Sequence, residues 1–191
     1  EAQAWEEAGA DAVVASGVEA GGHRGTFIGR QEDATLEARV LWPKVARAVE
    51  IPVIAAGGIM TGIDINEALA AGAQAVQMGT AFLVCDESSI PQSYKLRLIN
   101  AGDTPTRLTR AFSGRYARGL ENRFMKQLED VEKELPAYPV QNALTTPIRA
   151  AAAAKGDTEL MSLWAGAEVR RARAMPAAKL MQTLVAEMRT E

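Results

Sequence analysis

The sequence is poor in the residues that build disulfides and metal sites, with one cysteine and one histidine among 191 residues. A single cysteine excludes an intrachain disulfide framework, and one cysteine with one histidine argues against a zinc site, so we predict no metal. Cys85 lies in the apolar stretch FLVC (residues 82–85) and is predicted to be buried and unreactive. This cysteine usage is typical of a reducing compartment, and we predict a cytoplasmic location.

The sequence also lacks a strong charge of either sign and any long apolar run. Its 21 Lys and Arg nearly balance 24 Asp and Glu, and the formal net charge of -3 favours neither nucleic acid nor a membrane surface as a partner. No run approaches the roughly 18 apolar residues of a membrane span, so we expect no span. One local basic cluster is predicted to make helix-end contacts or internal ion pairs rather than to bind RNA or DNA. Its members are Arg107, Arg110, Arg115, Arg118 and Arg123.

What the sequence does contain is a repeated unit over residues 1–79: a helix, a glycine stop, a short apolar strand and a glycine-rich loop. Strands are predicted at residues 12–15, 53–56 and 75–78, and the alternation predicts parallel βαβ structure. Helices are predicted at residues 34–49 and 65–71, the second preceded by the capping-box spacing of Thr61 and Asp64. The small and β-branched strand residues favour a sheet that is buried on both faces.

Three strands cannot close a barrel, and a complete TIM (β/α)8 barrel needs about 250 residues. We therefore predict an α/β fold that holds only the last three strands of such a barrel plus C-terminal helices. A small open sheet with an unprotected edge is the alternative. The chain begins inside an expected helix and without methionine, so we expect an upstream part to be missing. Residues 1–85 are predicted to be the barrel part and residues 86–191 a helical region, with helices at 93–101, 120–135, 158–174 and 176–188.

His23 lies in a glycine-rich turn directly after the first predicted strand. An imidazole titrates near physiological pH, and flanking glycines let the backbone pass close to a ligand, so His23 is a candidate catalytic base. The neighbouring Glu19 either orients the imidazole or is solvated, and the sequence leaves both readings open. Because the next two strands also end in glycine turns, we expect all three strand ends to point to one place.

The two later glycine turns, Gly57-Gly58 and Gln77-Met78-Gly79-Thr80, form the strongest pair of features. Each is expected to present backbone N–H groups at the start of a helix, where unpaired donors and a partial positive charge favour an anion. Two such turns on neighbouring strands predict a phosphate clamp of the kind that barrel enzymes place after their last two strands.

Seven segments together resemble the nitronate monooxygenases, a family formerly called 2-nitropropane dioxygenases. They are GVEAGGHRG (17–25), IPVIAAGGI (51–59), QMGTAF (77–82), AFSGR (111–115), ARGL (117–120), YPVQ (138–141) and SLWAG (162–166). The resemblance therefore spans most of the chain. The first three segments are shared with flavin-dependent enoyl-carrier-protein reductases, whereas His-Arg-Gly and the later segments favour the nitronate enzymes.

The resemblance implies a TIM barrel that binds FMN and oxidises alkyl nitronates, or nitroalkanes, with dioxygen to a carbonyl compound and nitrite. On the family pattern His23 matches the active-site histidine. The implied cofactor neighbours are Ser16, Gly21 and Gly22 near the flavin and Gly58, Gln77, Met78, Gly79 and Thr80 around its phosphate. A homodimer is a further expectation.

Two departures from the family pattern affect this interpretation. The family often has glutamine where this chain has Ser16 and Ala167, so flavin contacts there are expected to be weaker or replaced by water. The first five barrel strands, and the flavin-binding asparagine that they carry in the family, are also absent. Two alternatives therefore stay open: an FMN- and NAD(P)H-dependent enoyl-acyl-carrier-protein reductase, or a truncated fragment with no activity alone.

Overall fold

A computed structural model describes residues 1–189 of the chain. The strands are β1 (Val13–Ser16), β2 (Gly22–His23), β3 (Val53–Ala56), β4 (Ala75–Gln77), β5 (Thr106–Thr109) and β6 (Ala117–Leu120). The helices are α1 (Ala2–Glu7), α2 (Ala38–Ala46), α3 (Gly62–Ala70), α4 (Thr80–Leu83), α5 (Gln92–Ile99), α6 (Arg123–Gln127), α7 (Val140–Lys155) and α8 (Ala177–Glu187), with 3-10 turns η1 (Gln31–Asp33) and η2 (Val169–Arg171).

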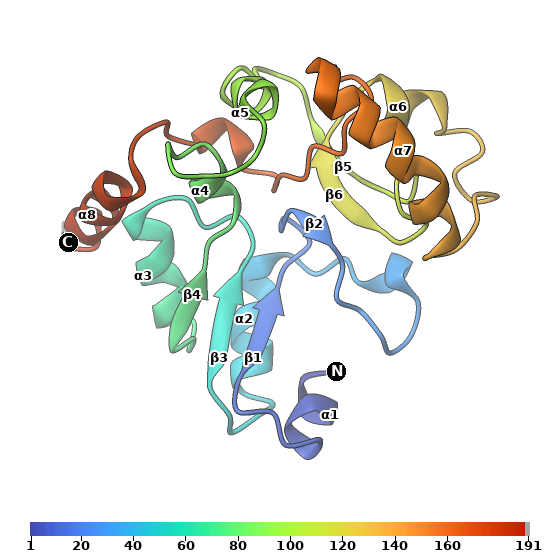
Figure 1. The fold of residues 1–191 in the computed structure, drawn as a ribbon. Coiled ribbons are helices and arrows are strands. Elements are labelled where there is room, and N and C mark those ends of the chain that lie inside the picture. The colour runs from blue at the N-terminus through green and yellow to red at the C-terminus, as the bar shows by residue number, and fades with distance from the viewer. Residues whose placement is uncertain (190–191) are drawn as a thin grey trace.

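The three predicted strands form one parallel sheet in the order β1-β3-β4, which confirms the α/β prediction. Ser16 pairs with Ala56, and Ala56 pairs with Gln77, so the three strands end at the same level. All three point toward the half of the molecule that contains β2, β5 and β6 (Figure 1). The sheet register therefore brings the three glycine turns together, as the sequence predicts.

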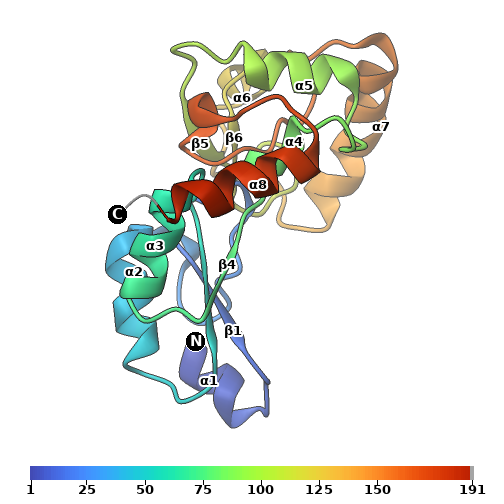
Figure 2. The ribbon, with the colours of Figure 1, turned by 90° about the vertical axis from the view of Figure 1, so that its left-hand side faces the viewer.

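Helices cover one face of this sheet, where α2 and α3 lie side by side (Figure 2). Trp42 of α2 is 1% exposed in the core between helix and sheet, and its indole N–H donates to the carbonyl of Ala56 over 3.2 Å. On the other face Val14 is 43% exposed, so the expectation of a sheet buried on both faces is wrong for these residues. The exposed face of β1 instead lines two cavities.

The predicted helix at residues 34–49 is shorter in the structure, where α2 covers only Ala38–Ala46. The carboxylate of Glu19 accepts a hydrogen bond from the backbone N–H of Ala38, at 2.9 Å to its nearer oxygen, and so fixes the first turn. Glu37 is extended just before it. A side chain nineteen residues upstream in the sequence thus decides where this helix begins. The spacing of apolar residues cannot reveal such a contact.

The predicted capping box at α3 is confirmed, with Thr61 and Asp64 bonded to each other's backbone N–H groups. The predicted C-terminal helix is confirmed as α8, which packs against α3 through the buried Leu180 and Leu184 (Figure 2). The two helices approach so closely that a Cβ on Gly62 would lie 2.3 Å from the carbonyl oxygen of Leu184. The end of the described chain is thereby attached to the parallel sheet.

A second, antiparallel sheet of order β2-β6-β5 is the main feature that the sequence did not predict. The helix predicted at residues 120–135 is wrong, because Leu120 ends β6 and only α6, begun by the side-chain cap of Asn122, is helical. The helix predicted at residues 158–174 is also wrong, because this segment crosses β6. The Leu120 N–H donates to the carbonyl of Leu163, and Gly119 bridges Trp164.

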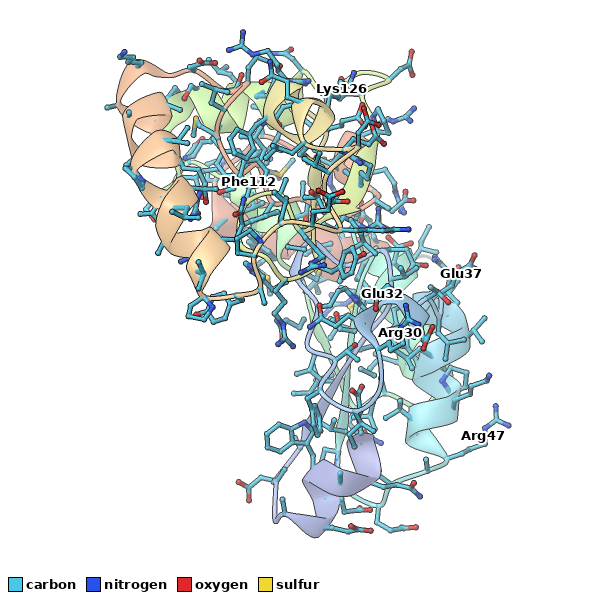
Figure 3. The ribbon with its side chains drawn as sticks, turned by 90° about the vertical axis from the view of Figure 1, so that its right-hand side faces the viewer. Arg30, Glu32, Glu37, Arg47, Phe112 and Lys126 are labelled. Carbon is cyan, nitrogen blue, oxygen red and sulfur yellow. The ribbon has the colours of Figure 1, made fainter. Side chains whose placement is uncertain are left out.

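The region after residue 85 is therefore mixed α/β rather than purely helical, although the predicted boundary between the two parts stays a prediction. Phe112 lies inside it between α6 and α7, whereas Lys126 on α6 is at the surface (Figure 3). The predicted helix at 93–101 is confirmed as α5. None of the helices among residues 1–189 is both long and apolar enough to cross a membrane.

Candidate active site

A cavity of about 620 Å³ lies at the C-terminal ends of the three parallel strands. It brings together all nine predicted site residues, namely Ser16, Gly21, Gly22, His23, Gly58, Gln77, Met78, Gly79 and Thr80. A second cavity of about 660 Å³ runs along the free edge of β1, but it contains neither His23 nor the glycine turns after β3 and β4. The first cavity is therefore the candidate site.

The loop after β1 brings its glycines against the cavity for two different reasons. A Cβ on Gly21 would lie 2.6 Å from the backbone of both Ala165 and Gly166, so only glycine fits between the two segments. Gly22 has a φ of +79° and no atom within 4 Å of its would-be Cβ, so its backbone faces open space. An open surface of this kind suits the close approach of a flat ligand.

The turns after β3 and β4 supply unpaired backbone donors. The N–H groups of Gly58, Gly79 and Thr80 have no hydrogen-bond acceptor among residues 1–189. Thr80 Oγ1 accepts a hydrogen bond from the Gly166 N–H at 2.9 Å, which connects the turn after β4 to the segment that follows Trp164. Three free donors at two adjacent strand ends can hold an anionic group.

The N-termini of the helices that follow these turns contribute less to anion binding than the sequence suggests. At α3 the N–H groups of Met60 and Thr61 donate to Asp64, and that of Gly62 donates to Glu187, so all three are already bonded. The helix after β4, α4, is only four residues long and has little macrodipole. Binding strength for an anion therefore rests on the turn N–H groups themselves.

His23 is on β2, which pairs antiparallel with β6 and extends from the parallel sheet toward the cavity. Its Nε2 lies 2.8 Å from Oγ of Ser113, and its ring meets Trp164 edge-on with ring centroids 5.3 Å apart. Burial, followed by the positive charges of Arg115 and Arg149, holds the pKa of His23 below its usual value of 6.5. The imidazole is therefore neutral at pH 7 and can accept a proton.

The two charged neighbours of His23 in the sequence stabilise the loop rather than the imidazole. Glu19 caps α2, so both readings that the sequence left open, an oriented imidazole or a solvated carboxylate, are wrong. Arg24 is 7% exposed and donates to the carbonyls of Gly17 and Ser16 over 2.7 and 3.1 Å. The guanidinium thus holds the loop against the end of β1, and that contact fixes where His23 lies.

A family model described as nitronate monooxygenase matches residues 1–187 of the chain. The chain belongs to the nitronate monooxygenase family. A probable nitronate monooxygenase of Staphylococcus aureus strain Newman is 45% identical over 186 residues, which are 97% of this chain and 52% of the relative. The chain thus spans about half the length of the curated relatives it matches.

Solved structures of related enzymes have the same fold as this chain of the nitronate monooxygenase family. A nitroalkane oxidase from Streptomyces ansochromogenes superposes with a TM-score of 0.91 at 52% identity, covering 98% of this chain and 54% of that one. FabK from Thermotoga maritima superposes with a TM-score of 0.80 at 35% identity, covering 98% and 57%. These similarities confirm the predicted class, a TIM barrel of which this chain holds three strands.

The structure adds cavity residues of this family member that the sequence did not single out. Trp164 and Tyr94 line the cavity together with the glycine turns, and the Tyr94 hydroxyl donates to the Trp164 carbonyl over 2.6 Å. Glu168 lines the cavity near Gly58, and its Cγ would be 3.6 Å from a Cβ there. Trp164 lies in the segment SLWAG, so the motif was visible in the sequence although its place was not.

The predicted burial of Cys85 and the predicted internal contacts of the arginine cluster are confirmed. Cys85 is 2% exposed, and its pKa is raised, mainly by burial and then by Glu87 and Asp86, which disfavours the reactive thiolate. The arginine cluster makes internal contacts. Arg107 pairs with Glu121 and Glu129, Arg110 bonds the carbonyl of Gly114, Arg115 bonds those of Arg24 and Thr26, Arg118 bonds that of Val18, and Arg123 pairs with Asp157.

Proposed function

We propose that this protein oxidises alkyl nitronates, and nitroalkanes that it first deprotonates, with dioxygen and FMN, and releases a carbonyl compound and nitrite. The observation that carries the proposal is the pairing, in one cavity, of a neutral imidazole with glycine turns that have free N–H donors. Family membership and the nitroalkane oxidase similarity support the substrate class. The activity is proposed for the whole protein. This chain spans about half the length of its curated relatives.

The residues of the cavity fit FMN. The N–H groups of Gly58, Gly79 and Thr80 are the donors that would hold its phosphate, and the open backbone of Gly22 leaves room for its ring. No lysine or arginine lines this cavity among residues 1–189, so backbone donors would bind the phosphate without a cationic side chain. When bound, FMN supplies the redox chemistry of the reaction.

The residues of this chain bind, orient and deprotonate the substrate. Neutral His23 takes the α-proton of a nitroalkane, or holds a nitronate by a hydrogen bond once the imidazole is protonated. Its pKa below the usual value keeps it ready as a base at neutral pH. Trp164 and Tyr94 line part of the cavity with largely apolar surface, which suits an alkyl chain.

The second candidate is an FMN- and NAD(P)H-dependent enoyl-acyl-carrier-protein reductase. The similarity to FabK favours it, and the turns after β3 and β4 would serve either enzyme equally. That similarity is weaker than the one to nitroalkane oxidase in both identity and TM-score. The nitronate reaction therefore stands first.

The test is an absorption spectrum and an oxygen-electrode trace of the purified full-length protein with propyl nitronate, with and without NADH. The proposal expects flavin bands and oxygen uptake that needs nitronate but not NADH. Flavin bands without nitronate-dependent uptake, together with NADH consumption on an enoyl thioester, would favour the reductase. Absence of flavin after reconstitution with FMN would exclude both enzymes.

A further inference from the structure

We infer that Ser113 is a positioning residue that fixes which ring nitrogen of His23 acts as the base. It holds the imidazole as the Nε2–H tautomer and leaves the lone pair on Nδ1. The inference deepens the proposed function and rests on it for the catalytic meaning of the tautomer. The hydrogen bonds themselves are independent of any substrate.

The tautomer follows from counting the hydrogens around the Ser113 hydroxyl. Its Oγ lies 2.8 Å from His23 Nε2, 3.0 Å from the Arg115 carbonyl oxygen and 3.3 Å from the Arg115 N–H. The carbonyl can only accept and the N–H can only donate, so the single hydroxyl hydrogen goes to the carbonyl. Oγ then accepts from both nitrogens, which requires a hydrogen on Nε2.

The opposite arrangement leaves a group unpaired. If the hydroxyl donated to Nε2, the Arg115 carbonyl would lose its donor, and no other donor to it exists among residues 1–189. An unmade hydrogen bond to a partly buried group costs roughly 1–3 kcal/mol. That difference is large enough to select one tautomer.

Ser113 acts on the imidazole and does not itself reach a substrate. It is 1% exposed and does not line the cavity, whereas His23 does. No residue among the described ones bonds His23 Nδ1, which leaves this nitrogen for a ligand. The Ser113 hydroxyl, which contacts Nε2 outside the cavity, thus leaves the lone pair of His23 on Nδ1, where it can accept a proton.

The turn that carries Ser113 is held firmly from behind by α7. Gln141 donates to the carbonyl of Ala111 over 2.7 Å, and the Thr145 hydroxyl donates to that of Phe112. Both polar side chains are buried, at 5% and 3% exposure. Buried polar side chains that bond the backbone of this turn restrain it, so the Ser113 oxygen has little freedom to move.

Aromatic packing holds the imidazole of His23, the hydrogen-bond partner of Ser113. Trp164 meets His23 edge-on on one side and Phe112 nearly perpendicularly on the other, with centroids 5.3 and 5.5 Å apart. Phe112 in turn stacks on Phe124 at 4.8 Å. The ring and the hydroxyl are therefore supported by one connected cluster, which favours a single geometry for their hydrogen bond.

The test uses the fact that His23 is the only histidine in the 191-residue chain. Long-range proton–nitrogen NMR of the labelled chain, at a pH above the pKa of His23, reports its tautomer from one imidazole alone. We expect only the Nε2–H tautomer and a slowly exchanging Nε2 proton. In Ser113→Ala the Nδ1–H form should become measurable and Nε2 proton exchange should accelerate about tenfold or more. Ser89→Ala, a change at an exposed serine, should leave both unchanged.

An Nδ1–H tautomer in the unmodified chain would overturn the inference, and so would an unaltered tautomer and exchange rate in Ser113→Ala. In the full-length protein we expect Ser113→Ala to lower kcat for a nitroalkane about tenfold with KM nearly unchanged. If the unmodified protein shows no nitronate-dependent oxygen uptake, the proposed function fails while the NMR result still decides the role of Ser113. If it is active but the tautomer is wrong, only this inference fails.

Discussion

Gly21 and Ala165 are in direct backbone contact, so close that a Cβ on Gly21 would lie 2.6 Å from the carbonyl carbon of Ala165. The first residue belongs to the loop that carries His23, and the second follows Trp164, which also lines the cavity. The Ala167 N–H donates to the carbonyl of Glu19 over 2.9 Å and closes the same junction. The position of His23 relative to Trp164 thus depends on glycine, which has no side chain, at position 21.

We predict that Gly21→Ala destabilises the protein by about 1–3 kcal/mol, because a methyl group there must displace backbone. Gly25→Ala is the matched control in the same loop, since nothing lies within 4 Å of its would-be Cβ and its φ is ordinary. That control should change the free energy of unfolding by less than about 0.5 kcal/mol. Urea unfolding measures both. Equal effects of the two substitutions would show that the junction is not tight.

We predict that His23→Asn in the full-length protein lowers turnover of a nitroalkane by about two orders of magnitude or more, the usual scale for loss of a general base. The flavin spectrum should stay the same, because asparagine retains polarity and none of the proposed phosphate donors changes. Oxygen-uptake rates with the nitroalkane and with the preformed nitronate measure the effect separately. Turnover at the unmodified rate on both substrates would remove His23 from the mechanism.

The pH profile should respond to the charge of Arg149. Its guanidinium is one of two cations that lower the pKa of His23, so Arg149→Met should raise that pKa. The neutral base then disappears at a higher pH on acidification, and the acid limb of kcat/KM moves upward in pH. Arg149→Lys retains the charge and should leave the limb near its original position. A limb that does not move in Arg149→Met would mean that burial and Arg115 set the pKa of His23 without Arg149.

Local sequence signals were enough to predict the parallel sheet and the glycine turns at its strand ends, whereas the flavin contacts of the site residues rest on the family resemblance and stay a prediction. The β1, β3 and β4 strands are short apolar runs that end in glycine, and the Thr61–Asp64 capping box is read from spacing alone. The nine predicted residues share one cavity because parallel strands of equal register must end together. These features depend on neighbours along the chain, and the sequence displays them directly.

The remaining features depend on partners that are distant in the sequence. The two-residue strand β2 has no apolar alternation, and it forms only because it pairs with β6 about a hundred residues later. Residues 158–174 have helical spacing, but bonds to β6 hold residues 163–165 extended. Ser113 lies ninety residues from His23, and no local pattern joins them. Tertiary contacts override propensity at these places.

Asp64 provides a test of stability that is separate from the chemistry of the cavity. Its side chain is 5% exposed, it accepts bonds from the N–H groups of Met60 and Thr61, and it pairs with Arg171 over 2.7 Å. Burial alone would raise its pKa, but these bonds and the Arg171 charge outweigh that effect and hold the pKa below its usual value of 3.8. The carboxylate therefore stabilises the fold at every pH at which it is ionised.

We predict that Asp64→Asn lowers the free energy of unfolding at pH 7 by about 1.5–3 kcal/mol, the range for hydrogen bonds to charged groups. The folded pKa lies below the unfolded one, so this stabilisation is complete above pH about 4 and is lost as the pH falls through the folded pKa. The difference in the free energy of unfolding between the unmodified protein and Asp64→Asn should therefore narrow on acidification below that pH. Glu67→Gln, which removes an exposed partner of Arg39, should cost at most about 1 kcal/mol. A gap that stays constant down to the lowest pH at which both proteins fold would show that packing, and not charge, explains the effect.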